Sequence, residues 1–279
     1  MCSAPPTPIT RALPDLQAWT AHFLAAPLPV LADTAELLEA YRANEDAVDA
    51  HLLAETVSAD PLMSLKLMAH VAGVRSRRST ADPETVTAAL VMLGISPFFR
   101  AFGPQTTVDE YLGGNPEALQ GLDEVLRRAH RGAAFALAFA VHRMDHGAQV
   151  IHAAALLHDF AEMLLWCHAP DLALRIDAMQ AADPELRSSV AQRSTLNIEL
   201  AELQRALAER WRLPALIAES TAEARAVGAT DARIVALAAR LARHTAVDWD
   251  NAAIPDDVTE IAGLLNLSPL ATLSLLQGI

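Results

Sequence analysis

Five times along the chain a capping side chain stands directly before a proline, a pairing typical of the first turn of an α-helix. The five pairs are Asp60-Pro61, Asp82-Pro83, Asn115-Pro116, Asp183-Pro184 and Ser268-Pro269. The capping oxygen can accept a hydrogen bond from a backbone N–H of the first turn, and the N–H that proline lacks would have no partner there. We therefore predict a helix start at each pair.

Between these starts, apolar residues recur every three or four positions, as in the series Leu196, Leu200, Leu203 and Leu207. This spacing places them along one face of a helix. Hydrophobic residues are 52% of the chain but aromatic residues only 5%, so most apolar surface comes from Ala and Leu, which favour helix over strand. We predict an all-α fold of about a dozen helices.

The densest run of turn-forming residues lies between 102 and 116. We predict that it separates two packed lobes of a multi-helix bundle, an N-terminal lobe of residues 15–112 and a C-terminal lobe of residues 116–279. Residues 1–14 contain three prolines and no basic stretch followed by an apolar one, so we expect a flexible tail and not a signal peptide.

The charge balance excludes some classes of partner. Lys and Arg number 21 against 34 Asp and Glu, a formal net charge of -13, which disfavours binding to nucleic-acid phosphates or anionic lipid. The longest uncharged apolar runs, such as residues 132–141 and 148–157, are shorter than the roughly 18 residues that cross a bilayer. Cys2 and Cys167 are too few for a disulfide framework. We expect a cytoplasmic protein that binds neither nucleic acid nor membrane.

Ten histidines supply possible metal ligands and proton carriers. Most of them stand singly on helical patterns, and for these we expect structural or surface roles; His152 is the least clear of them. His158-Asp159 differs, because two ionisable groups follow the small apolar run of residues 153–157. Burying a carboxylate there is costly unless it is paired.

Residues 155–159, which read Ala-Leu-Leu-His-Asp, resemble the end of the apolar helix in the HD metal-dependent phosphohydrolases. In that superfamily a His, a His-Asp pair and a distant Asp bind one or two metals. The resemblance assigns the first ligand to His130, which lies 28 residues before His158, and the next two to His158 and Asp159. The fourth position falls at Ala239, where the superfamily has an aspartate.

Further segments narrow the resemblance to the HDOD (HD-related output domain) family of bacterial signalling proteins, and they follow the order of that family over most of residues 25–225. The segments are Pro27-Leu28-Pro29-Val30-Leu31, Asp60-Pro61-Leu62-Met63-Ser64, the apolar helix ending in Leu93-Gly94, and Leu207 to Pro214 with its Trp211-Arg212-Leu213-Pro214 ending. The resemblance implies an HDOD/HD-like helical fold.

The chain also departs from these relatives. Active hydrolases of the superfamily often follow the His-Asp pair with Ile-Gly-Lys, whereas Phe160-Ala161-Glu162 stands here. The family often has a His before its Trp and a His-His pair after it, where this chain has Leu200 and residues 223–225. Together with Ala239, these departures favour a degenerate site.

We therefore expect a non-catalytic bacterial signalling module that acts by binding a protein or a small effector, with no cofactor. In it, His130, His158 and Asp159 would make hydrogen bonds instead of holding a metal. One alternative is a metal-dependent phosphohydrolase or phosphodiesterase that uses these three ligands, with Asp231 or Asp248 as a substitute for the fourth.

A further alternative is a nucleic-acid or nucleotide binder that uses basic clusters, namely Arg75, Arg77 and Arg78, or Arg127, Arg128 and Arg131. Clusters of this size are commonly solvated helix ends, since positive charge near a helix C-terminus is favourable by itself.

Overall fold

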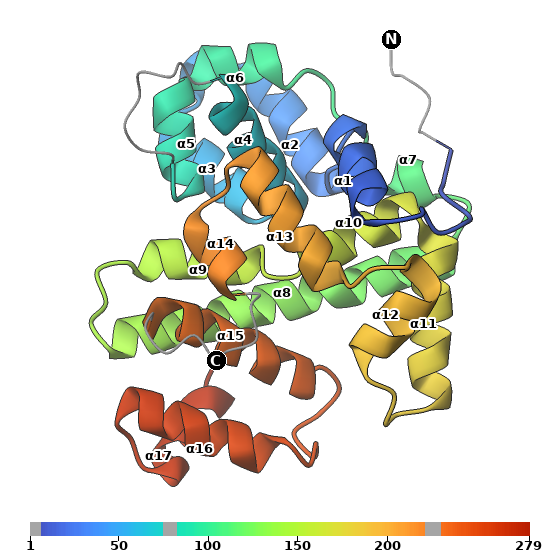
Figure 1. Cartoon of the computed structure of the whole chain (residues 1–279). Helices are drawn as coiled ribbons and strands as arrows, with labels where there is room; N and C mark the ends of the chain where they lie inside the picture. Colours follow the sequence, from blue (N-terminus) through green and yellow to red (C-terminus); the bar gives the residue numbers. More distant parts are fainter. Residues whose placement is uncertain (1–6, 75–82, 221–229) are drawn as a thin grey trace. The chain divides into compact units, whose positions relative to one another are not determined.

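The computed structural model describes residues 7–74, 83–220 and 230–279, and its named secondary-structure elements in these ranges are all helices (Figure 1). The one extended pairing within them is an isolated parallel bridge between Val30 and Thr107. The all-α prediction is therefore confirmed. Several residues named from the sequence lie outside the described ranges: Cys2, Arg75, Arg77, Arg78, Asp82 and residues 223–225.

Three of the predicted helix starts are confirmed, at α4 (Pro61–Val74), α8 (Pro116–His142) and α17 (Pro269–Gln277). The residue before each proline caps its helix as expected. Asp60 accepts from the backbone N–H groups of Leu62 and Met63, and the side chains of the other two caps accept from the third helical residue.

The other two predicted starts are wrong. The carboxylate of Asp183 accepts the N–H of Glu185 and closes a tight turn, so α12 (Ser188–Leu196) begins only after it. α5 (Val86–Leu93) likewise begins beyond Pro83 and has Thr85 as its cap. Because an aspartate side chain can cap a turn as well as a helix, the Asp183-Pro184 pair is compatible with the turn observed there.

The chain folds into two compact units, and neither is continuous in sequence. The first consists of residues 1–125 and 159–213, and the second of residues 126–158 and 214–279. This grouping differs from the predicted lobes of residues 15–112 and 116–279. It differs because the segment after residue 159 returns to pack among the N-terminal helices, a long-range contact that no local turn signal reveals.

The first unit contains the first part of α8 and the whole of α4, α5 and α12. Its other helices are α1 (Leu16–Ala25), α2 (Ala32–Ala43), the short 3-10 helix η1 (Glu45–Ala47), α3 (Ala50–Ser58), α6 (Ile95–Ala101), α7 (Val108–Leu112), α10 (Phe160–His168), α11 (Pro170–Ala182) and α13 (Leu200–Trp211). α13 packs against α1, α4 and α10, as Figure 1 shows.

Aromatic rings anchor the core of this unit. Phe98 and Phe102, on and after α6, lie with ring centroids 4.9 Å apart among buried aliphatic side chains of α3, α4 and α5. Trp19 of α1 is fully buried, and its indole N–H donates to the backbone carbonyl of Leu196 at the end of α12. This bond attaches the first helix to a segment far along the chain.

Asp60 also organises the first unit beyond its own helix. Its fully buried carboxylate accepts the N–H of Leu31, which holds the loop between α1 and α2 against the start of α4. Six residues onward, nearly two helical turns, the ammonium of Lys66 donates to the carbonyl of Leu28 and the side chain of Gln105. Burial lowers the pKa of Lys66 to about 8, although the negative charge of Asp60 acts in the other direction and raises this pKa. The Asp-Pro segment thus has a structural role here.

The N-terminal segment is held in place over its described part, residues 7–15. The N–H of Ile9 donates to the carbonyl of His168, and the side-chain amide of Asn197 donates to the carbonyl of Leu13. This attachment differs from the flexible tail expected over residues 1–14. Both partners lie more than 150 residues away in sequence, so the proline content of the segment could not indicate them.

The second unit contains the rest of α8 and five further helices over its described residues. They are α9 (Ala148–Leu156), α14 (Ala215–Ser220), α15 (Thr230–His244), α16 (Ile254–Leu265) and α17. α15 packs against α9, α14 and α16, and α17 folds back on α16. Six residues of α15 are almost completely buried: Ile234, Val235, Leu237, Ala238, Leu241 and Ala242. α15 is thus the central helix of this unit.

One helical stretch, residues 148–168, has the length and apolarity of a membrane span, with a mean hydropathy of 1.3 over the best window. That window is 67% buried inside the protein. Such burial is typical of a core helix, whose apolar surface is covered by neighbouring helices and not by lipid.

Candidate functional site

The residues assigned from the resemblance lie on α8, after α9 and on α15. α8 and α15 approach closely at Gly132, because a Cβ atom there would lie 3.6 Å from the Cα of Ala239 and 3.6 Å from the Cβ of Ala242. His130 precedes Gly132 by two residues, about 3 Å along the helix axis. The structure therefore places Ala239, which is 5% exposed, near the level of His130.

His130 lies on the exposed side of α8. His152 of α9 is close enough to feel its charge: burial lowers the pKa of His152, and the charge of His130 lowers it further. The sequence offered no partner for His152, but a helical residue two turns before His158 is well placed to meet the facing helix. His130 thus has His152 as a histidine neighbour in the second unit, which the resemblance did not indicate.

His158 and Asp159 lie at the break between α9 and α10, and both are half-buried. The N–H of His158 donates to the carbonyl of Ala155. Asp159 precedes the first residue of α10, but its carboxylate accepts no hydrogen bond from the first turn. Asp159 belongs to the first unit, whereas His130, His158 and Ala239 belong to the second. The predicted convergence of the three retained side chains stays a prediction.

The donor set does not fit a metal ion as it stands. Over the described ranges, no group of three or more His, Cys, Asp or Glu side chains is arranged to hold one. At position 239, to which the resemblance assigns the fourth ligand, a methyl group has no electron pair to donate.

Asp231 and Asp248 are the possible substitutes for that ligand, and neither lies beside Ala239 in the chain. Asp231 is in the first turn of α15, eight residues or about 12 Å along the helix from Ala239. Burial raises the pKa of Asp231, and the charge of Asp145 raises it further, so Asp145 is its neighbour. Asp248 lies in the exposed loop after α15, where its carboxylate accepts the N–H of Asp250.

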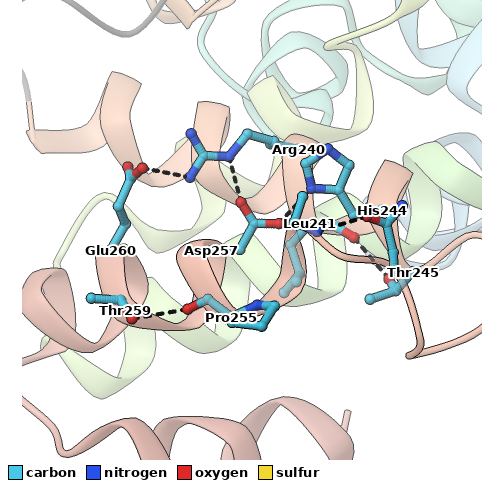
Figure 2. Close-up of polar contacts among 10 residues, drawn as sticks. Arg240, Leu241, His244, Thr245, Pro255, Asp257, Thr259 and Glu260 are labelled. Atoms are coloured by element: carbon cyan, nitrogen blue, oxygen red, sulfur yellow. Dashed lines mark hydrogen bonds and ion pairs between the residues drawn. The ribbon is translucent and has the colours of Figure 1, made fainter. Parts of the chain in front are cut away.

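A second polar cluster joins α15 to α16 (Figure 2). The carboxylate of Asp257, which is 2% exposed, lies 2.7 Å from Nε of Arg240 and 2.6 Å from Nδ1 of His244. Nη2 of Arg240 also lies 3.0 Å from the carboxylate of Glu260. We call these four residues the α15–α16 clamp. Arg240 and His244 are four residues apart on α15, and Asp257 and Glu260 are three apart on α16, so each pair lies on one helix face. This spacing is the sequence signal that could have indicated the clamp.

A pair of histidines lies in the first unit, where the sequence suggested two unrelated residues. The rings of His22 of α1 and His168 of α10 have centroids 5.6 Å apart. His168 is 3% exposed, and burial followed by the charge of His22 lowers its pKa to about 4. In the described structure neither Nε2 atom has a hydrogen-bond partner. The pair is therefore neutral near pH 7.

Comparisons with known proteins agree with this architecture. A family model described as the HDOD domain matches residues 28–227. No protein with a curated function matches the chain.

Several solved structures share the fold at low sequence identity. A MmoQ response regulator from Methylococcus capsulatus str. Bath has a TM-score of 0.65 at 18% identity, covering 91% of this chain and 99% of its own. A virulence factor from Campylobacter jejuni subsp. jejuni has a TM-score of 0.63 at 18% identity, covering 91% and 90%. An HDOD domain protein of unknown function from Geobacter sulfurreducens has a TM-score of 0.51 at 16% identity, covering 94% and 93%.

Proposed function

Because the chain belongs to the HDOD family, we propose that it is a bacterial signal-transduction module without catalytic activity, which acts in the cytoplasm by binding a protein or a small effector. The observation that carries the proposal is Ala239. It stands on the buried, α8-facing side of α15, and the resemblance assigns to this position the carboxylate of the related hydrolases. A hydrolytic metal site needs enough ligands to hold the ion and an open position for water.

Other observations support the regulatory part of the proposal. The neighbour from Methylococcus capsulatus is named a response regulator, a protein of signalling. The net charge of -13 disfavours nucleic acid and anionic membranes as partners. Of the basic cluster on α8, Arg131 donates to the backbone carbonyl of Thr245 at the end of α15. That residue therefore contributes to packing within the second unit.

The test is metal content and turnover measured on the same purified protein. The protein is incubated with Mn²⁺ or Zn²⁺, desalted and analysed for metal, and is then assayed with p-nitrophenyl phosphate and bis(p-nitrophenyl) phosphate. We expect less than one equivalent of retained metal and no turnover above that of the His158→Gln variant. His51→Gln, which changes an exposed histidine, is the matched control.

The competing function is a phosphohydrolase or phosphodiesterase that uses His130, His158 and Asp159 alone. It predicts metal-dependent turnover that disappears in His158→Gln and persists in His51→Gln. That pattern would overturn the non-catalytic proposal.

A further inference from the structure

The first unit carries a groove of about 510 Å³ between the first part of α8 and α11, with α10 beneath it. This volume is within the range of pockets that hold ligands or the side chains of a partner. The residues that line the groove all belong to the first unit, and none is among the candidate metal ligands.

Both walls of the groove carry carboxylates. Glu117 and Glu124 stand on α8, and Asp171 and Asp177 stand on α11, all with exposed side chains. Arg175 is the single basic residue in the lining. Within the described part of the chain, none of the four carboxylates is in an ion pair with Arg175 or with another cation. The groove therefore has an uncompensated negative charge that a cationic ligand could neutralise.

The floor of the groove is aromatic. Trp166 of α10 is 6% exposed, and that remaining surface lines the groove. Its six-membered ring lies against the backbone of Gly121 in α8, where an added Cβ would come within 2.3 Å of the ring. Glycine at 121 thus lets the indole sit directly under α8. An indole below carboxylates suits a guanidinium, which can stack on the ring and bond a carboxylate with two N–H groups.

The spacing of the carboxylates indicates an elongated ligand. Glu117 and Glu124 are seven residues apart on α8, about 10 Å along the axis, and Asp171 and Asp177 are about 9 Å apart on α11. In an extended peptide, side chains on one face repeat about every 7 Å, so two basic residues separated by one residue can reach both ends of such a row.

We propose that this groove binds a basic segment of a partner protein, in which two arginine side chains meet the carboxylates and one of the two guanidinium groups stacks on Trp166. An apolar floor with a charged rim is the usual anatomy of a protein–protein interface. The inference rests on the proposed function for its expectation of a protein partner. The peptide-binding experiments below do not depend on the metal and turnover assays. The proposal for the groove and the proposal of a non-catalytic role can therefore be overturned independently.

The first test measures binding by fluorescence anisotropy with a labelled peptide of sequence Ala-Arg-Leu-Arg-Ala. The groove variant combines Glu117→Gln, Glu124→Gln, Asp171→Asn and Asp177→Asn. The control variant combines Glu36→Gln, Asp46→Asn, Asp109→Asn and Glu185→Gln, which removes the same charge from exposed sites of the same unit outside the groove. Circular dichroism checks that both variants fold.

We expect the groove variant to bind at least tenfold more weakly than the parent and the control variant to stay within threefold. Each exposed ion pair changes an affinity by up to about fivefold, so four lost pairs suffice for the larger effect. If the groove variant and the control variant lost affinity for the peptide equally, net charge alone would explain the effect and the proposal would be overturned. The proposal would also be overturned if the parent protein did not bind the peptide at millimolar concentration.

Two further arms identify the ligand. Ala178→Lys adds a positive charge to the lining of the groove on exposed helical surface, and it should weaken binding of the peptide at least fivefold. A peptide of sequence Ala-Glu-Leu-Glu-Ala should not bind. Spermidine represents a free cationic ligand: binding as tight as that of the arginine peptide would overturn the assignment to a polypeptide.

Discussion

The side chain of Ala239 is a methyl group on the face of α15 that meets Gly132 of α8. Its neighbours on α15, Ala238 and Ala242, are also buried and small, which allows the two helices to approach. A carboxylate at 239 would add an oxygen donor near the level of His130, whereas one at Ala238, 100° around the helix, would point elsewhere.

For this reason Ala239→Asp should raise the affinity for Zn²⁺ at least tenfold, and Ala238→Asp should not. Isothermal titration calorimetry on both variants and the parent measures the difference. The threshold is modest, since loss of even an outer partner of a metal ligand commonly costs about tenfold or more. Equal zinc binding by the parent and Ala239→Asp would show that Ala239 is not the fourth-ligand position.

His168 makes the stability of the first unit depend on pH. Burial holds its pKa at about 4 in the folded protein, below the ordinary value of 6.5. A base whose pKa is lowered by folding contributes its full stability above pH 6.5, and this contribution is lost as the pH falls toward 4. Between pH 7 and pH 4.5 the loss from this residue is about 2.5 kcal/mol.

We expect His168→Phe to reduce the difference in unfolding free energy between pH 7 and pH 4.5 by about 2 kcal/mol, because the variant has no group to titrate there. Urea denaturation at the two pH values provides the measurement. His51→Phe, at a largely exposed histidine, is the control and should leave the difference unchanged. His168→Gln serves if the larger ring disrupts packing. If both His168 variants still lost as much unfolding free energy between pH 7 and pH 4.5 as the parent, the loss would come from groups other than His168.

At the scale of elements, the α15–α16 clamp attaches the C-terminal helices to the centre of the second unit. Asp257 is buried in the first turn of α16, and its partners Arg240 and His244 are 34% and 24% exposed. Removing the carboxylate leaves Arg240 with Glu260 as its remaining partner in the clamp and takes away the clamp partner of His244. The cost is at the lower end of that for breaking a buried pair, because water can reach both partners.

Asp257→Ala should therefore lower the unfolding free energy by about 3 kcal/mol. Asp256→Asn is a matched control, because Asp256 is in the same helical turn but exposed, and it should cost less than about 0.5 kcal/mol. Both values come from urea denaturation at pH 7. A loss in Asp257→Ala no larger than in the control would show that the clamp adds little to stability.

Local patterns predicted the elements well where the cap and the following apolar period agreed. Asn115 and Ser268 both begin helices that bury residues at intervals of four, namely 118, 122 and 126 in α8 and 272 and 276 in α17. Asp183 is likewise a capping residue followed by a proline, but the residues after it are mostly exposed and form a turn. The capping bond alone is compatible with either structure, and packing of the following residues decides between them.

At the scale of the whole molecule, the division into units depends on contacts between distant segments. Residues 159–213 join residues 1–125, although α8 and α9 lie between them in sequence. Bonds such as that from Trp19 to Leu196 hold this arrangement. The His22–His168 pair and the two walls of the groove likewise bring together segments that are distant in sequence.

The amino-acid sequence by itself determined the all-helical class through its local periodicity and the family through its resemblance to known motifs, and it predicts a missing carboxylate at Ala239. Only the tertiary structure decided that His22 meets His168, that Gly121 receives Trp166 and that α11 faces α8 across a groove. The physical reason is that helix formation depends on neighbours three or four residues away, whereas burial, pKa and concave surfaces depend on which helices pack together.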